Sequence, residues 1–191
     1  MNDELTRLAR SLRVFFCDSD GVLFSGSVLM GMPHKAKQRS HIDGQGISLL
    51  RAAGIRIVFI TNEKDDHAAA IRETVEKFNS LPSSKPQKND GWEPVVLFEG
   101  RGGEKKLEAA ENFLREHHLT MESAAYMGDD INDAPLLLKV ALPAAPVSAE
   151  EAIKKIAKFV SERPGGAGAI RDFVNTILEA RGIDPLTLPT Q

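Results

Sequence analysis

The sequence predicts an α/β fold in which a parallel β-sheet carries helices on both faces. Short apolar runs alternate along the chain with segments whose apolar residues recur at helical spacing. Each apolar run is nearly continuous, which is typical of parallel strands that are covered on both sides. An order of strands and helices like this one places ligands at the carboxyl ends of the strands.

The expected elements follow one another in a regular order. Strands are predicted over residues 14–17, 55–60, 95–98, 124–127 and 158–160. Helices are predicted over residues 46–53, 65–78, 104–118, 149–157 and 169–181, with Ser148 capping the fourth and Gly182 closing the last. Residues 79–94, which contain three prolines and one glycine and show no useful periodicity, are expected to form a long surface loop, and the tail 184–191 is expected to fray.

The composition is that of one soluble globular domain, so residues 1–191 are expected to share one core. A net charge of -3 and a pI near 6.0 provide no basic surface for nucleic acid or for an acidic membrane. Residues 1–13 are charged and polar, and no run approaches the ~20 apolar residues of a membrane span. We therefore expect a cytoplasmic protein whose partners are small molecules or its own copies. The single cysteine, Cys17, is expected to be a buried strand residue.

Two carboxylates, Asp18 and Asp20, stand where the first apolar run ends and a glycine turn begins. Because neighbouring carboxylates repel each other, such a pair usually serves a divalent cation or proton transfer. The alternative is a solvated turn after a strand.

A second acidic cluster follows the strand predicted at 124–127 and contains Asp129, Asp130 and Asp133. If the two strands are neighbours, Asp129 lies close to Asp18, and their oxygens suit a hard ion such as Mg²⁺. Asp133 is then either a carboxylate that supports the metal site from behind or an acid at a helix N-terminus.

Two further segments offer groups for an anion. Thr61 and Asn62 follow the second predicted strand and present a hydroxyl and backbone N–H groups, although simple helix capping has the same pattern. Lys105 and Lys106 stand at a helix start, where a lysine opposes the helix dipole. At least one of them is expected to meet an anion, unless both are solvated surface residues.

Taken in order, these segments resemble the four motifs of the haloacid dehalogenase superfamily: D-x-D-G, a Thr or Ser, a Lys, and G-D-D-x-x-D. The resemblance covers about residues 14–171 and implies a Rossmann-like fold. It implies that Asp18 attacks phosphorus to give an aspartyl-phosphate and that Asp20 is the general acid and base. Thr61 would hold the phosphoryl group, and Lys106 would neutralise its charge.

The same resemblance implies a magnesium cofactor. Mg²⁺ would bind Asp18, the backbone carbonyl of Asp20, and Asp129, with Asp130 and Asp133 behind these ligands. Phosphatases and mutases of the superfamily keep an aspartate at the place of Asp20, whereas dehalogenases do not, so phosphoryl transfer is favoured.

The spacing between Asp18 and Thr61 leaves no room for a large cap domain. Residues 24–41 instead look like the small β-hairpin insertion of the 3-deoxy-manno-octulosonate 8-phosphate phosphatase subfamily, which lacks a cap, and 43–47 match its D-G-x-G-I signature. The glycine-rich segment 163–171 is similar to the tail of that subfamily. Members are typically tetramers in which a neighbouring subunit covers each active site. Helix capping at Asp43 and an ordinary glycine loop before a helix are the alternatives.

The chain departs from that subfamily after the second strand, where Thr61-Asn62-Glu63-Lys64 replaces the usual T-G-R. This pattern is closer to relatives that act on 9-phosphates of nine-carbon keto-deoxy acids, such as sialic acid or its deaminated analogue. Losing the arginine removes a planar carboxylate-binding group, so the substrate contacts must differ. The candidate substrate-binding residues are Asn62, Glu63, Lys64, Gly44 and Arg171. Glu63 could instead be an ordinary acid at a helix N-terminus.

The resemblance therefore predicts a magnesium-dependent phosphatase acting on an eight- or nine-carbon sugar acid phosphate. It would work as a cytoplasmic homotetramer that makes a precursor of surface glycans such as lipopolysaccharide. A broad-specificity phosphatase and a non-catalytic oligomerisation module of the same fold are the two alternatives. The intact set of motif residues argues against the second.

Overall fold

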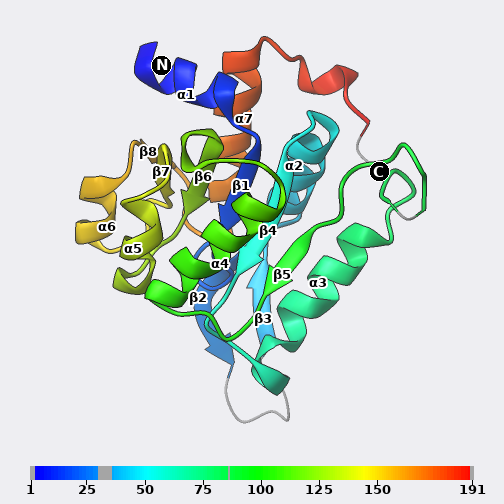
Figure 1. Cartoon of the computed structure of the whole chain (residues 1–191). Coiled ribbons are helices and arrows are strands. Elements are labelled where there is room, and N and C mark those ends of the chain that lie inside the picture. Colours follow the sequence, from blue (N-terminus) through cyan, green and yellow to red (C-terminus); the bar gives the residue numbers. More distant parts are fainter. Residues whose placement is uncertain (1–2, 30–35, 86, 190–191) are drawn as a thin grey trace.

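The computed structural model describes residues 3–29, 36–85 and 87–189 and is shown in Figure 1. The strands are β1 Val14–Cys17, β2 Phe24–Leu29, β3 Ala36–Arg39, β4 Arg56–Ile60, β5 Val96–Phe98, β6 Ala124–Met127, β7 Leu142–Ala145 and β8 Phe159–Val160. The α-helices are α1 Asp3–Ser11, α2 His41–Ala52, α3 Ala69–Asn79, α4 Glu104–Glu116, α5 Ala134–Leu137, α6 Glu151–Ile156 and α7 Ala169–Arg181.

Six strands form one parallel sheet in the order β5-β4-β1-β6-β7-β8. Strand β1 lies between β4 and β6, so that Val14 pairs with Arg56 on one side and with Ala124 on the other. All four residues of β1 are buried, as its unbroken apolar sequence predicts. The prediction of a parallel sheet with helices on both faces is confirmed.

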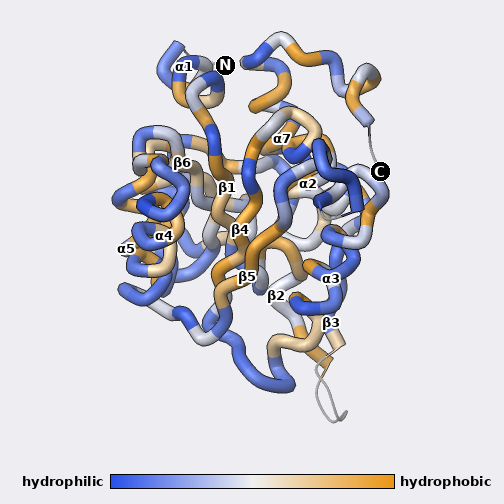
Figure 2. The backbone as a smooth tube through the Cα atoms, turned by 45° about the vertical axis from the view of Figure 1, so that its right-hand side comes forward, coloured by the Kyte–Doolittle hydropathy of each residue, from blue (hydrophilic) through white to orange (hydrophobic). Residues whose placement is uncertain are grey.

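Side chains of β1 alternate between the two helical layers because successive residues of a strand point to opposite faces. Phe15 and Cys17 pack in a cluster with α1, α2, α3 and α7, whereas Val14 and Phe16 pack with α4, α5 and α6. Figure 2 shows the apolar strands at the centre and the polar segments around them. Cys17 is a buried core residue, and burial raises the pKa of its thiol well above the usual value.

Strands β2 and β3 form a separate antiparallel hairpin below the carboxyl ends of the main sheet in Figure 1. The hairpin predicted at 24–41 is thus present, while its residues 30–35 lie outside the described residues. Among the residues that the structure describes, no cap domain covers the sheet edge. None of the described helices combines the length and the apolar character that a membrane span needs.

Several local features differ from the predictions: α1 and α5 were not predicted, and α2 begins at His41 instead of residue 46. Ser148 does not cap α6, because its Oγ accepts the N–H of Gly165, at 3.1 Å, on the glycine-rich loop. The tail was expected to fray, yet Pro185–Thr187 forms a 3₁₀ turn capped by Asp184, and Leu188 packs on the core. Strand β7 was not predicted, because its sequence Leu-Pro-Ala-Ala is short and contains a proline.

The loop that follows α3 is held by one buried arginine. Arg51 donates to the carbonyl of Phe78 at 2.8 Å and to Ser84 Oγ at 2.9 Å, and its guanidinium lies 5.3 Å from the ring centroid of Trp92. Burial lowers the pKa of Arg51 to about 10. The loop predicted at 79–94 is therefore anchored to the body of the protein at the end of the sheet opposite the hairpin (Figure 1).

Asp43 joins the hairpin side of the fold to the glycine-rich loop. Its buried carboxylate accepts the N–H of Gly168 at 2.9 Å and that of Arg171 at 3.0 Å. Asp43 therefore caps α7, which is distant in sequence, while Ser40 caps its own helix α2. The alternative of a helix cap at Asp43 is thus what the structure shows, and the capped helix is distant in sequence.

Candidate active site

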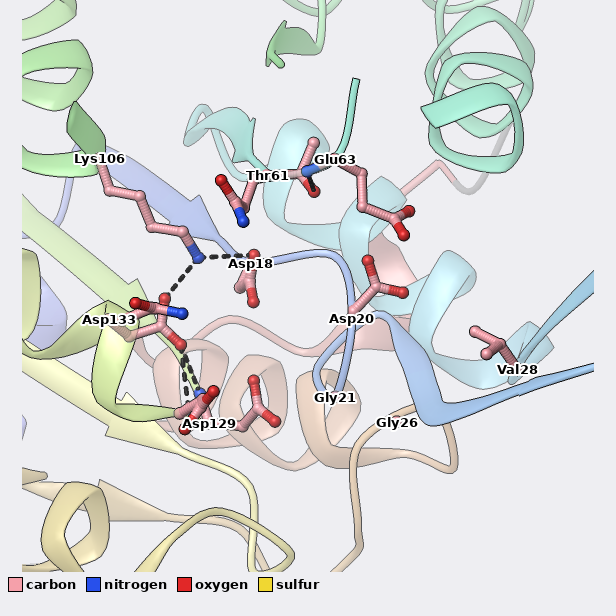
Figure 3. Close-up of a pocket in the computed structure, with 13 residues that line it drawn as sticks. Asp18, Asp20, Gly21, Gly26, Val28, Thr61, Glu63, Lys106, Asp129 and Asp133 are labelled. Carbon is pink, nitrogen blue, oxygen red and sulfur yellow. Dashed lines mark hydrogen bonds and ion pairs between the residues drawn. The ribbon is translucent and has the colours of Figure 1, made fainter. Parts of the chain in front are cut away.

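The predicted motifs meet at the carboxyl ends of four neighbouring strands. The N–H of Asp18 bonds to Met127 at the end of β6, and the N–H of Thr61 bonds to Phe98 at the end of β5. These ends surround a cavity of about 310 Å³, shown in Figure 3. Its lining consists of Asp18, Asp20, Gly21, Gly26, Val28, Thr61, Asn62, Glu63, Lys106, Asp129, Asp130, Asn132 and Asp133.

Lys106 lies at the centre of the acidic side of this cavity. It enters from the first turn of α4, is only 2% exposed, and its Nζ lies 2.8 Å from Asp18 and 2.5 Å from Asp133. Burial alone would lower the pKa of Lys106, but Asp18 and Asp133 outweigh it and raise that pKa above the usual value. Lys106 is therefore a fixed positive charge, whereas the neighbouring Lys105 is exposed.

Asp133 is buried and uses both of its carboxylate oxygens. One carboxylate oxygen binds Lys106 and the hydroxyl of Tyr126, and the other accepts the N–H groups of Asp129 at 2.9 Å and Asp130 at 3.1 Å. Asp133 thereby holds the loop after β6 and orients Lys106 at the same time. Asp130 is exposed, and it caps the short turn at Ile131.

Three carboxylates crowd together beside Lys106. One oxygen each of Asp18, Asp129 and Asp133 lies within 4.8 Å of the others. Burial raises the pKa of Asp18 to about 8. The charge of Lys106 lowers this pKa, and the charge of Asp133 raises it. Burial, followed by Asp133, raises the pKa of Asp129 to about 7. One lysine cannot balance three ionised carboxylates, so the donor set fits a divalent cation that prefers oxygen ligands.

The turn after Asp20 leaves no space for a side chain at Gly21. A Cβ there would lie 1.9 Å from Asp129 Oδ2, and the residue has a φ of +78°. A Cβ at Gly165, on the glycine-rich loop, would lie 1.7 Å from the carbonyl oxygen of Gly21. The glycine-rich loop thus packs directly behind the turn that carries Asp20 and helps to fix its path.

Metal binding should stabilise the protein strongly at alkaline pH and weakly at acid pH. The pKa values of Asp18 and Asp129, raised from 3.8 to about 8 and about 7, mean that the metal-free fold binds protons more tightly than the unfolded chain does. Stability without metal therefore falls as pH rises through this range. Mg²⁺ replaces those protons, so the melting temperature should rise more on adding Mg²⁺ at about pH 8 than at about pH 5.

Scanning calorimetry with EDTA or Mg²⁺ at both pH values checks this expectation. Asp129→Asn should lose the Mg²⁺-dependent increment at alkaline pH. Equal increments at the two pH values would contradict the assignment of the acidic cluster as a metal site.

The opposite side of the cavity carries polar groups from three segments. Ser19 Oγ lies 2.9 Å from Thr61 Oγ1 and 2.9 Å from Asp20 Oδ2. Thr61 Oγ1 also accepts the N–H of Glu63 at 3.1 Å. Lys37, from the hairpin, contacts Asp20 at 2.7 Å and pairs with Glu63.

The structure does not bring all predicted substrate-binding residues to this cavity. Asn62 and Glu63 line it, as does Thr61. Gly44 lines a separate cavity of about 220 Å³ with Arg39 and His41. Lys64 is exposed and is not among the residues that line either cavity, and Arg171 hydrogen-bonds to Asn175 on α7. For Gly44, Lys64 and Arg171, a substrate contact stays a prediction.

Three residues of the site were not foreseen. Lys37 lies in a hairpin whose sequence shows no motif that would single out a lysine. Ser19 could have been suspected because it stands between the two acids of the first motif, and Tyr126 because it is the only tyrosine and precedes the second acidic cluster. All three side chains are buried, which periodicity alone does not reveal.

Comparisons with known proteins agree with this geometry. A family model described as haloacid dehalogenase-like hydrolase matches residues 29–170. The chain is 28% identical over 180 residues to the 3-deoxy-D-manno-octulosonate 8-phosphate phosphatase KdsC of Yersinia pestis, covering 94% of this chain and 86% of that protein.

Two solved structures are similar over nearly the whole chain. The 3-deoxy-D-manno-octulosonate 8-phosphate phosphatase of Yersinia pestis superimposes with a TM-score of 0.82 at 26% identity, over 100% of this chain and 93% of that one. The Moraxella catarrhalis phosphatase, in complex with a magnesium ion, a phosphate ion and KDO, has a TM-score of 0.80 at 20% identity, over 94% and 93% of the two chains. The second likeness concerns the fold alone. With its parallel sheet, its acidic cavity and the family model that spans most of its length, the chain belongs to the haloacid dehalogenase-like hydrolases.

Proposed function

We propose that this hydrolase removes phosphate from a 3-deoxy-2-keto sugar acid by way of an aspartyl-phosphate on Asp18. The observation that carries the proposal is the convergence of Asp18, Lys106, Thr61 and Asp20 on one cavity, with two further carboxylates beside Asp18. These are the groups that phosphoryl transfer needs: a nucleophile, a positive charge, a hydroxyl and an acid.

In the first step, a carboxylate oxygen of Asp18 attacks phosphorus and forms a new O–P bond. The ester O–P bond breaks, and its electron pair leaves with the sugar oxygen, which takes a proton from Asp20. Lys106, 2.8 Å from Asp18, faces the charge on the phosphoryl oxygens, and the Thr61 hydroxyl donates to one of them.

In the second step, water attacks the phosphorus of the aspartyl-phosphate while Asp20 takes a proton from it. The bond between Asp18 and phosphorus breaks, which releases inorganic phosphate and restores the carboxylate of Asp18 and the protonated form of Asp20. Asp133 stays bound to Lys106 and to the backbone of the loop after β6, so it keeps the lysine in place throughout.

Magnesium is the cofactor that fits these donors. Asp18, Asp129 and the backbone carbonyl of Asp20 would hold it, and when bound it supplies positive charge that orients the phosphate and screens it from the carboxylates. The crowding of three carboxylates around one lysine supports this ligand set.

The relatives support a sugar acid as substrate, since a protein similar in sequence and one similar in structure are both octulosonate 8-phosphate phosphatases. Glu63, where that subfamily has an arginine, favours a nine-carbon 9-phosphate as the natural ester, in line with the departure seen in the sequence. A broad-specificity phosphatase is the second candidate, because no described segment other than the hairpin covers the cavity.

Self-association and a cytoplasmic location are part of the proposal. Leu29 is 68% exposed and Val28 38% exposed on strand β2 of the hairpin, beside the cavity. Burying these side chains against other copies would produce the homotetramer and close the site. Sedimentation equilibrium measures the assembly directly.

Phosphate release from the octulosonate 8-phosphate, a nonulosonate 9-phosphate and simple phosphate esters, with and without Mg²⁺, tests the function. A preference of about a hundredfold in kcat/KM for one sugar acid would name the substrate class, since it corresponds to about 2.7 kcal/mol of transition-state binding. Similar rates on all esters would favour broad specificity. Absence of metal-dependent turnover would sink the proposal.

A further inference from the structure

The hairpin lysine Lys37 is the feature of the site that its four motifs leave unexplained. Its side chain has no exposed surface, and its ammonium lies 2.7 Å from Asp20 Oδ1, 2.9 Å from Asp20 Oδ2, and in contact with Glu63. The ring of Phe24 lies 5.5 Å away. A buried ammonium costs several kcal/mol unless partners compensate it, so these two carboxylates are what keep Lys37 in this position.

The orientation of the Asp20 side chain depends on its contacts with neighbouring side chains. It follows the end of β1 on a turn, and a third of its side chain is exposed toward the cavity. Lys37 contacts both of its oxygens, and Ser19 Oγ lies 2.9 Å from Oδ2. These contacts restrict the orientation of the carboxyl group: Oδ2 takes the hydrogen bonds, and Oδ1 has the charge contact with Lys37.

Glu63 holds Lys37 from the other side. It stands on the loop after β4, whereas Asp20 follows β1 and Lys37 belongs to β3, so the ion pairs join three segments. Figure 3 shows the carboxyl groups of Asp20 and Glu63 on the same side of the cavity. Because its carboxylate is paired with Lys37, Glu63 can influence the reaction through that lysine.

We propose that Lys37 is a positioning residue that aims Asp20 at the leaving oxygen, and that Glu63 acts through Lys37 by fixing its ammonium. This inference rests on the proposed phosphatase function and deepens it. Lys37 transfers no proton. For the first step Asp20 is protonated on one oxygen and keeps the other against Lys37, and that proton passes to the sugar oxygen as the O–P bond breaks.

The leaving group provides the sharpest test, because only a poor leaving group needs an aimed acid. A sugar phosphate leaves as an alkoxide and requires the proton from Asp20, whereas 2,4-dinitrophenyl phosphate leaves as a stable phenolate and does not. The rate of leaving-group release in a single turnover reports the first step alone. Lys37→Met should lower this rate for the preferred sugar acid phosphate by about a hundredfold, the lower range of general acid catalysis. It should lower the same rate for 2,4-dinitrophenyl phosphate by less than about fivefold. Asp20→Asn should give the same pattern.

A double-mutant cycle tests the role of Glu63. Glu63→Gln should lower sugar phosphate turnover by about tenfold in the wild-type background and cause no further loss in Lys37→Met, because coupled residues are not additive. If Glu63 contacts the sugar directly, the losses caused by Glu63→Gln and Lys37→Met multiply in the double variant, and Glu63→Gln also raises KM. That result would overturn the role proposed for Glu63.

Two further variants make the outcome decisive. Lys37→Gln is measured alongside Lys37→Met, because it keeps a hydrogen-bond donor at the buried position and so protects the fold. The exposed Lys105→Met is the matched control. Equal losses on both esters, or full activity on the sugar phosphate, would overturn the inference while leaving the phosphatase proposal standing. A wild-type chain inactive on both esters would overturn the phosphatase proposal itself.

Discussion

Asp18→Asn should abolish turnover, with a fall in kcat of at least about 10⁴-fold. An amide oxygen is a poor nucleophile toward phosphorus, and the loss of a nucleophile that works within a catalytic unit removes most of the rate enhancement. The fold should persist, since asparagine has nearly the same shape and Lys106 keeps its partner Asp133. Removing one of three crowded carboxylates also relieves repulsion in the metal-free protein.

Phosphate release in the presence of Mg²⁺, together with a melting curve, measures both parts of this expectation. Mass spectrometry after acid quenching should detect a phosphorylated wild-type chain and an unmodified Asp18→Asn chain. Asp90→Asn, whose side chain is exposed on the loop after α3, is the control for removing an aspartate. A variant at Asp18 that kept near wild-type turnover would rule out Asp18 as the nucleophile.

Lys106→Met should impair both catalysis and stability. The variant removes the positive charge beside the transferring phosphoryl group, an effect of about 10²- to 10³-fold in kcat for a group of this kind. It also leaves Asp18 and Asp133 buried without their common partner, which should lower the free energy of unfolding by about 3 kcal/mol at alkaline pH.

The neighbouring lysine makes the comparison sharp. Lys105→Met changes the same residue type in the same helical turn, but its side chain is exposed, so its unfolding free energy should stay within about 0.5 kcal/mol of the wild type. Urea unfolding and steady-state kinetics of the two variants measure both effects. Equal behaviour of Lys105→Met and Lys106→Met would contradict the central position of Lys106.

The predicted architecture was accurate where it depends on the pattern of apolar residues within one short segment. Apolar runs such as 14–17 mark buried strands because a parallel strand must be apolar on both faces. Asp18, Thr61 and Asp129 each follow such a run, and the carboxyl ends of parallel strands share one edge of the sheet. Strand direction alone therefore places these residues on one edge of the sheet, and their meeting in one cavity depends on β4, β1 and β6 being neighbours.

The partners of individual side chains depended on packing between distant segments. Asp43 caps a helix 125 residues further along the chain, and Lys37 finds its partners on two other loops. Asp133 binds a lysine and a loop at once because it stands directly before α5, which packs against α4. Periodicity places a residue on an element and a face, but a hydrogen bond or an ion pair is fixed only when those elements pack against each other.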